Sequence, residues 1–276
     1  VDFTGSPSYG AELETRTSRR VFTETAGVNA VILESVADLD PVLAALARGL
    51  SLFRAQMCTA PQNIFIPPAV QTADGPVPRG RVIERLVAAL DTISHDGRVA
   101  AAVCGALHSE RTAENVDALM GEFVRQAPAH VLRVSHPFEH PEYPDARTRT
   151  PLLLWDEVGS RHHQAEVFGP VAFVVPVEDR MQALAVASDE ANAHGAIASY
   201  CYTTDPEYAE QVQETFFEAG ASVGFNLIGQ SPMNFTAAYS DYHVTGLNPA
   251  GNACLTDLAF VADRFRIVQA KTELHD

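Results

Sequence analysis

Short, continuous apolar runs alternate along this chain with longer segments in which apolar residues recur at helical spacing. The apolar runs predict strands buried on both faces, as in a parallel sheet, at residues 28–34, 64–66, 171–175, 199–203 and 221–227. The periodic segments predict helices at residues 38–58, 82–90, 112–125, 178–194 and 205–219. This alternation predicts an α/β fold with a mostly parallel sheet flanked by helices.

Other segments give weaker patterns. Residues 130–134 alternate as a strand, and residues 260–271 indicate a last strand after a loop-like stretch from 228 to 258. Residues 67–79 are rich in Pro, Gly and Asp and predict a loop. Residues 100–104 fit a helix or a strand, and the pattern does not decide between the two.

Composition narrows the class of protein. A formal charge of −16 over 276 residues argues against nucleic acid or an anionic membrane surface as a partner, because both are bound through Lys and Arg. The sequence lacks an apolar run near the ~20 residues that a membrane helix needs. The four cysteines lack metal or redox spacing, which indicates free thiols in a reducing compartment, and we expect a cytoplasmic protein.

A cluster of two His and two Glu lies within residues 136–145 and raises the question of a metal site. Three prolines in the same segment exclude helical ligand spacing, and the zinc-protease pattern H-E-x-x-H is absent. The segment is therefore interpreted as a surface excursion, and no metal is expected.

Cys58 is the strongest candidate for a catalytic nucleophile. It lies between the first long helix and the short strand 64–66, where rigid elements would hold a reactive loop. The far end of a helix does not favour a thiolate, so any activation must come from elsewhere. Glu24 lies 34 residues upstream and could act as a base. The alternative for Cys58 is a buried, inert thiol, which is the commonest state of a free cysteine.

Four motifs in order carry a resemblance to a known family. Glu24-Thr25-Ala26-Gly27-Val28-Asn29 is followed by a helix and by Gln56-Met57-Cys58. Phe3-Thr4-Gly5-Ser6 precedes them, and Glu166-Val167-Phe168-Gly169-Pro170-Val171 follows. Together they resemble the aldehyde dehydrogenase superfamily. The tail, residues 246–257 with Arg264-Phe265, resembles its branch linked to phenylacetate ring-opening and degradation.

This resemblance implies a set of roles. Cys58 would be the nucleophile and Glu24 the base that activates water. Gly5 and Ser6 would lie in the nucleotide-binding turn, Glu166 would hold a cofactor ribose hydroxyl, and Phe168 would pack near the nicotinamide. Asn226 would match the family's Val-Asn position near the active site. The cofactor would be NAD or NADP, and the substrate a small aldehyde such as a ring-opened coenzyme A semialdehyde.

The resemblance also implies a domain organisation. Residues 1–27 would be a remnant of the nucleotide-binding domain, 28–227 the catalytic domain, and 228–276 a return loop with a strand that adds to a neighbouring subunit of a homo-oligomer. A large part would precede Val1, including an oxyanion-stabilising Asn and a nucleotide-binding Lys, so we expect the chain alone to be inactive.

The sequence departs from the family pattern at two glycines. Ala55 replaces the Gly before Gln-x-Cys, and Ala26 replaces the first Gly after the Glu24 dipeptide. Alanine allows less backbone freedom than glycine, which bears on the geometry of the cysteine loop. Two other functions stay open: a cysteine-dependent thioesterase, and a non-catalytic interaction domain that keeps the fold.

Overall fold

The computed structural model describes residues 1–25, 27–229, 244–253, 258 and 262, and its centre is a seven-stranded sheet. The strands lie in the order β11-β10-β3-β4-β9-β8-β7, and all neighbours are parallel except β7 and β8. Their bounds are Ala30–Leu33 (β3), Asn63–Ile66 (β4), Val131–Arg133 (β7), Leu152–Trp155 (β8), Val171–Pro176 (β9), Ala198–Tyr202 (β10) and Ser222–Phe225 (β11). The mostly parallel α/β fold expected from the sequence is confirmed.

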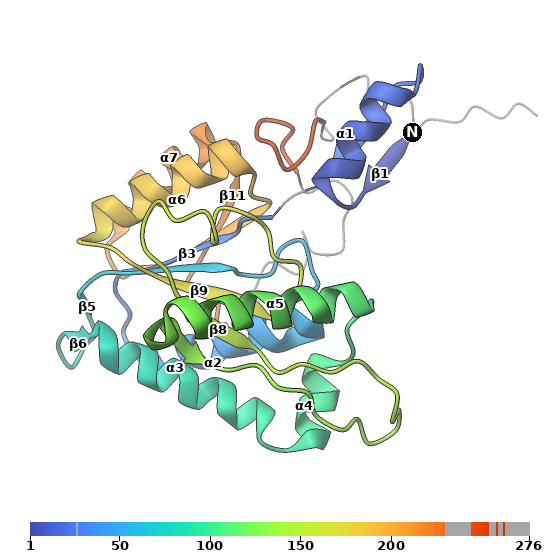
Figure 1. The fold of residues 1–276 in the computed structure, drawn as a ribbon. Helices are drawn as coiled ribbons and strands as arrows, with labels where there is room; N and C mark the ends of the chain where they lie inside the picture. Colours follow the sequence, from blue (N-terminus) through green and yellow to red (C-terminus); the bar gives the residue numbers. More distant parts are fainter. Residues whose placement is uncertain (26, 230–243, 254–257, 259–261, 263–276) are drawn as a thin grey trace, which may run out of the picture.

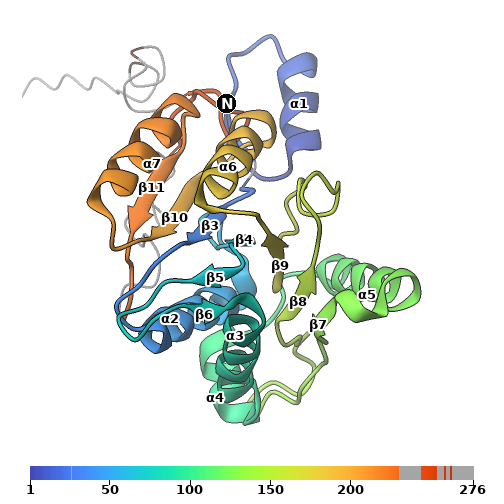
Figure 2. The same cartoon turned by 90° about the vertical axis from the view of Figure 1, so that its left-hand side faces the viewer.

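Helices cover both faces of this sheet (Figures 1 and 2). Helix α2 (Leu39–Ser51) and α3 (Arg79–Ser94) pack on one face, and α5 (Glu110–Gln126), α6 (Arg180–His194) and α7 (Pro206–Glu218) pack on the other. Alternate residues of one strand enter the two cores, since Val31 and Leu33 face α2 while Ala30 and Ile32 face α6. Burial on both faces explains why these strands are uniformly apolar.

A smaller layer lies beside the sheet at the N-terminus (Figure 1). Strands β1 (Asp2–Thr4) and β2 (Phe22–Glu24) form a two-stranded parallel sheet, and α1 (Pro7–Arg16) connects them. The boundary expected near residue 27 falls between β2 and β3, and the division into domains stays a prediction.

The long helix expected to carry Cys58 at its end is shorter than predicted. Helix α2 stops at Ser51, and a distorted 3₁₀ turn, Leu52–Ala55, follows it. Phe53, Arg54 and Ala55 all have left-handed backbone conformations, with φ of 48°, 61° and 50°. Three such residues interrupt the helical backbone, so Cys58 lies in a separate turn rather than on the helix.

Arg54 holds this unusual turn in place. Its side chain is completely buried, and its guanidinium donates to the main-chain carbonyl of Gly105, with an Nε–O distance of 2.9 Å, and to that of Arg149. The guanidinium also lies over the ring of Phe138, 4.6 Å from its centroid. Left-handed non-glycine residues cost of order 1–3 kcal/mol each and persist only where their surroundings fix them. Ala55 therefore adopts the backbone that a glycine would favour, and Arg54 supplies much of the restraint.

Other elements refine the sequence predictions. The undecided segment 100–104 belongs to helix α4 (Gly97–Cys104). Helix α5 begins at Glu110, two residues before the expected start, and is capped by Ser109, whose Oγ accepts from the Thr112 amide at 3.2 Å. The loop 67–79 contains a small hairpin of β5 (Ala69–Val70) and β6 (Val77–Pro78).

Two further expectations concern the predicted C-terminal strand and membrane-spanning helices. The predicted strand 260–271 lies outside the described residues except for Ala262. Within the described part, none of the helices is long and apolar enough to cross a membrane.

Replacing Arg54 with Lys tests the restraint on the cysteine turn. A lysine cannot donate to both Gly105 and Arg149, so we expect the free energy of unfolding to fall by about 2 kcal/mol or more. Urea denaturation measures this change. Arg81→Lys on the exposed surface of α3 is the control, and it should change stability by less than about 0.5 kcal/mol. Equal stability of the two variants would contradict the assigned role of Arg54.

Candidate active site

The predicted site lies at the amino-terminal edge of the main sheet. Strands β3, β4, β9 and β10 are adjacent and parallel, so the four segments that enter them meet at this edge. Gly27 and Asn29 precede β3, Cys58 precedes β4, and Glu166 precedes β9. Residues distant in the sequence are therefore neighbours because they enter neighbouring strands.

One cavity of about 1120 Å³ collects all six residues predicted to act in catalysis or cofactor binding. Its wall combines the turn at residues 4–7, the end of β2, the turn around Cys58, one face of α5, and the segment before β9. The six residues are Gly5, Ser6, Glu24, Cys58, Glu166 and Phe168. The sequence placed them in four separate motifs, and the fold brings those motifs to one cavity.

Cys58 is half-buried and lines this cavity, whereas Cys104 and Cys201 are buried within the fold. Burial, together with the nearby charges of Glu24 and Glu166, raises the pKa of the Cys58 thiol to about 12. The backbone amides of Cys58 and Thr59 act in the opposite direction and lower it. The thiol is thus protonated at neutral pH in this structure, and the amides favour the thiolate.

Glu24 ends strand β2 and is buried, with 6% of its surface exposed. The tail 246–253, which the sequence linked to one branch of the family, lies along this strand. The Thr25 amide donates to the Ala250 carbonyl at 2.7 Å, and the Asn252 amide donates to the Thr23 carbonyl at 3.1 Å. This pairing fixes the strand that carries Glu24.

Glu166 approaches the cysteine turn across Gly27. A methyl group added to Gly27 would lie 2.6 Å from the Cys58 carbonyl oxygen and 3.3 Å from Glu166 Oε1. Only glycine leaves enough room for this approach, which explains the glycine of the Glu-x-x-Gly-x-Asn motif. Burial raises the pKa of Glu166 to about 7, so its carboxyl is both a donor and an acceptor near neutral pH.

Gln62 fixes the backbone on both sides of Glu166. Its Oε1 accepts from the Val167 amide at 2.8 Å, and its Nε2 donates to the Ala165 carbonyl at 3.0 Å. Because Gln62 lies between Cys58 and the first residue of β4, one side chain joins the cysteine turn to the Glu166 segment.

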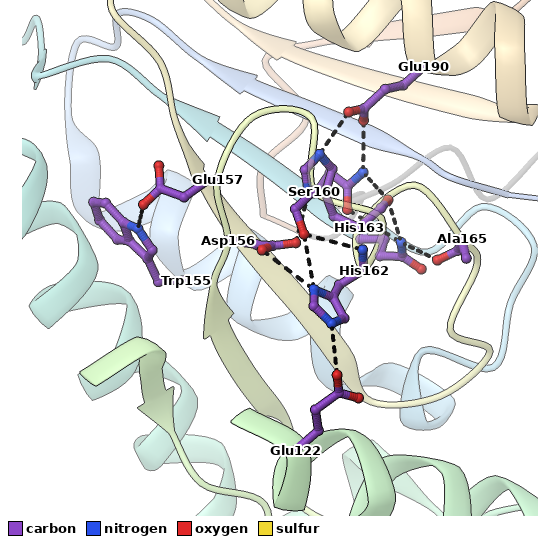
Figure 3. A network of polar contacts seen from close by, with 11 residues as sticks. Glu122, Trp155, Asp156, Glu157, Ser160, His162, His163, Ala165 and Glu190 are labelled. Carbon is purple, nitrogen blue, oxygen red and sulfur yellow. Dashed lines mark hydrogen bonds and ion pairs between the residues drawn. The ribbon is translucent and has the colours of Figure 1, made fainter. Parts of the chain in front are cut away.

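His163 supports the same segment from within the core (Figure 3). His163 lies in a turn between β8 and β9, and its side chain is completely buried between two carboxylates. Its Nδ1 lies 2.9 Å from Asp156 Oδ2, and its Nε2 lies 2.8 Å from Glu190 Oε1. Burial alone would lower the pKa of this imidazole, but the bonds to Asp156 and Glu190 raise it to about 9. His163 is therefore an imidazolium at neutral pH.

The neighbouring histidine extends this network toward the cavity. His162 Nε2 lies 3.3 Å from Oε1 of Glu122, a residue of α5 that lines the cavity wall. Asp156 contacts both histidines, because its Oδ1 lies 3.8 Å from His162 Nδ1 and its Oδ2 lies 2.9 Å from His163 Nδ1. Acidic and imidazole groups thus alternate from α6 to α5, and no sequence motif indicated this connection.

Gly5 and Ser6 form the turn between β1 and α1. Ser6 caps the helix, with its Oγ 3.4 Å from the Tyr9 amide, and Pro7 occupies the first turn. The Gly5 amide donates to the Glu24 carbonyl at 3.0 Å, which joins this turn to β2. The helix N-terminus faces the cavity and can accept an anion.

Phe168 presents an exposed ring, 42% accessible, to the cavity. His108 lies edge-on to this ring at 5.9 Å, and its Nδ1 lies 2.9 Å from Gln56 Oε1. Neither His108 nor the contact of Gln56 with it was found from the sequence, since the two residues are far apart and belong to no shared motif.

Asn226, which the resemblance placed near the active site, lies elsewhere. Its side chain accepts from the Thr203 amide at 3.0 Å and donates to the Thr203 carbonyl at 2.9 Å. Thr203 follows β10, so Asn226 stands at the carboxyl edge of the sheet, opposite Cys58, where it bridges the ends of two strands.

Across the described residues, no group of three or more His, Cys, Asp or Glu side chains is arranged to hold a metal ion.

Comparison with known proteins gives the family. The aldehyde dehydrogenase family model matches residues 1–237, and this chain belongs to that family. A solved NAD-dependent aldehyde dehydrogenase from Burkholderia multivorans is 38% identical and superposes with a TM-score of 0.87; the match covers 98% of this chain and 48% of that one.

Two curated relatives are more distant. A 3,4-dehydroadipyl-CoA semialdehyde dehydrogenase from Aromatoleum evansii is 29% identical over 224 residues, which are 75% of this chain and 41% of the relative. An NADP(+) succinate-semialdehyde dehydrogenase from Deinococcus radiodurans is 27% identical over 218 residues, covering 78% and 43%. The chain therefore spans less than half the length of the relatives it matches.

The reactivity of Cys58 toward alkylation follows from its exposure. Under limiting iodoacetamide, we expect Cys58 to be labelled faster than the buried Cys104 and Cys201, with a rate that rises through the alkaline range because the thiol pKa is about 12. Glu24→Gln removes a charge that disfavours the thiolate and should speed labelling at pH 8 by about threefold or more.

Mass spectrometry of the labelled peptides measures these rates. Glu84→Gln, on the exposed surface of α3, is the control and should leave the rate unchanged. Labelling of Cys104 or Cys201 as fast as that of Cys58 in the unmodified chain would refute the special position of Cys58.

The buried imidazolium of His163 makes stability depend on pH. Its pKa is raised from 6.5 to about 9, so its contribution is complete below about pH 6.5 and is lost as the pH rises to about 9. That contribution is on the order of 3 kcal/mol. Denaturation at a series of pH values should show this loss, and His163→Gln should flatten the profile.

His95→Gln, at an exposed position beyond α3, is the matched control and should keep the unmodified profile. A stability curve of His163→Gln that parallels the unmodified one between pH 6.5 and 9 would refute the charged state of His163.

Proposed function

We propose that the protein of which this chain forms a part oxidises an aldehyde to the acid with NAD or NADP, through a thioester on Cys58. The observation that supports this most directly is that one cavity holds Cys58, Glu24, Glu166 and the Gly5-Ser6 turn together. The membership of the chain in the aldehyde dehydrogenase family supports it independently.

Cys58 acts as the nucleophile in this proposal. Its thiolate adds to the aldehyde carbon and gives a thiohemiacetal on the enzyme. The bound nicotinamide cofactor supplies an acceptor for the hydride that leaves this carbon, and the product on Cys58 is a thioester. The thiol proton must leave before addition, and the amides of Cys58 and Thr59 favour the thiolate while Glu24 and Glu166 oppose it.

Glu24 acts as the base for the second half of the reaction. It takes a proton from water, the hydroxide oxygen adds to the thioester carbon, and the carbon–sulfur bond breaks to release the acid and the Cys58 thiolate. Its place at the end of β2, on the cavity wall, puts it within the same chamber as the sulfur.

The residues on the cavity wall fit the nicotinamide end of a dinucleotide. A carboxyl with a pKa near 7, Glu166, suits a ribose hydroxyl, because it can donate or accept. The exposed ring of Phe168 offers an apolar surface to a flat heteroaromatic group. The capped N-terminus of α1 suits a phosphate group.

The proposed substrate class rests on resemblance to other proteins. A ring-opened coenzyme A semialdehyde is the substrate class suggested by the name of the relative from Aromatoleum evansii and by the tail resemblance. A homo-oligomer is proposed on the resemblance of residues 260–268 to the family's assembly strand.

The dehydrogenase activity is proposed for the longer protein and not for the 276-residue chain. Residues 1–27 supply one strand-helix-strand unit of a nucleotide-binding fold, and the chain covers only 41–48% of its matched relatives. We propose that residues 1–27 belong to the cofactor domain and residues 28–227 to the catalytic domain.

Activity assays of the longer protein and of the 276-residue chain test this proposal. The longer protein should reduce NAD or NADP with a panel of semialdehydes, and Cys58→Ala should lower the rate by at least about 10³. The chain alone should not reduce either cofactor but should hydrolyse 4-nitrophenyl acetate slowly, because acyl transfer through Cys58 needs no nicotinamide.

Cys201→Ala is the matched cysteine control and should keep activity. In Glu24→Gln of the longer protein, mass spectrometry should detect an acyl adduct on Cys58. Undiminished turnover in Cys58→Ala, or cofactor reduction by the chain alone, would overturn the assignment.

A further inference from the structure

Asn29 forms hydrogen bonds with both ends of its buried side-chain amide. Nδ2 donates to the main-chain carbonyls of Cys58 at 2.7 Å and Ala60 at 2.9 Å. Oδ1 accepts from the amides of Ile197 at 3.1 Å and Ala198 at 3.0 Å. The residue is 1% exposed, so all these bonds form away from solvent. Asn29 therefore joins the cysteine turn to the entrance of β10.

The main chain of Asn29 binds the same turn a second time. Its carbonyl accepts from the amides of Gln62 at 3.0 Å and Asn63 at 3.1 Å, where β4 begins. Two residues earlier, Gly27 lies so close to the Cys58 carbonyl that a methyl group there would overlap it. The turn from Cys58 to Asn63 thus rests on one short segment before β3.

The bond to the Cys58 carbonyl has a consequence for the sulfur. In a trans peptide, the C=O of one residue and the N–H of the next point in opposite directions. Because Asn29 holds the Cys58 carbonyl, the Thr59 N–H of the same peptide is held in the opposite direction. The Thr59 amide is one of the two that favour the Cys58 thiolate.

We propose that Asn29 is a positioning residue for Cys58: its amide fixes the Cys58–Thr59 peptide so that the Thr59 N–H faces the sulfur. This inference rests on the proposed role of Cys58 as nucleophile and assigns the last residue of the Glu-x-x-Gly-x-Asn motif a part in that role. Asn29 does not touch the reacting atoms, and it acts through the backbone of Cys58.

Asparagine suits this position because its amide has a donor side and an acceptor side. Aspartate would face the carbonyls of Cys58 and Ala60 with a carboxylate oxygen, and leucine would leave both carbonyls without their donor. Serine is shorter and can form only some of these hydrogen bonds. Substitutions at position 29 therefore remove the hydrogen bonds in graded steps.

The experiment measures the alkylation rate of Cys58 by iodoacetamide from pH 7 to 10 in Asn29→Ala and Asn29→Ser of the 276-residue chain. We expect Asn29→Ala to react about tenfold more slowly at pH 8, with its rate profile displaced to higher pH, and Asn29→Ser to lie between it and the unmodified chain. Labelling of Cys104 and Cys201 in the same samples reports whether the core stays closed.

Val212→Ala is the control for loss of stability alone. Val212 is completely buried in α7, so the variant loses core packing without touching the cysteine turn, and its Cys58 profile should be unchanged. If Asn29→Ala exposes Cys104 and Cys201, the serine variant carries the test.

The outcomes separate this inference from the proposed function. An unchanged or faster Cys58 profile in the serine variant, with Cys201 still protected, would overturn the positioning role and leave the nucleophile intact. In the unmodified chain, a Cys58 that reacts no faster than Cys201 would refute the nucleophile, and this inference with it.

Discussion

The constraint on which the site depends is that buried polar side chains must hold irregular backbone at the entrance of four parallel strands. A turn packed against a sheet edge exposes carbonyl and amide groups that water cannot reach, and each one left without a partner costs about 1–3 kcal/mol. Asn29 and Gln62 satisfy such groups around Cys58 and Glu166, and Arg54 binds the carbonyls of Gly105 and Arg149 from the cysteine turn. The same bonds that stabilise the fold therefore set the geometry of the cavity.

The electrostatics of the cavity work against its proposed nucleophile. Cys58 is partly buried beside two carboxylates, and both burial and charge raise the pKa of its thiol. A protonated thiol resists adventitious oxidation and alkylation, since the thiolate is the reactive form. The backbone amides of Cys58 and Thr59 provide a local preference for the thiolate without a permanent positive charge. Small displacements of this one peptide would change the reactivity of the sulfur.

The sequence predicted the layered fold well because its strands are buried on both faces and its helices are amphipathic, and both properties are written locally in the chain. It failed where long-range contacts override local preference. The periodic pattern through Phe53 indicated a continuous helix, but three left-handed residues, held by Arg54, end it. Asn226 was placed by motif, yet it lies at the opposite edge of the sheet, where its bonds are to Thr203.

The sequence by itself determined the strands, the helices and the short motifs that name Cys58, Glu24 and Glu166, because spacing and residue type are local properties. Only the tertiary structure decided that these motifs share one cavity, since parallel strands brought their entrances to a common edge. The tertiary structure also decided the hydrogen-bond partners of His163 and Asn29. A buried imidazole or amide is paired by residues up to 169 positions away, and no local pattern records such distances.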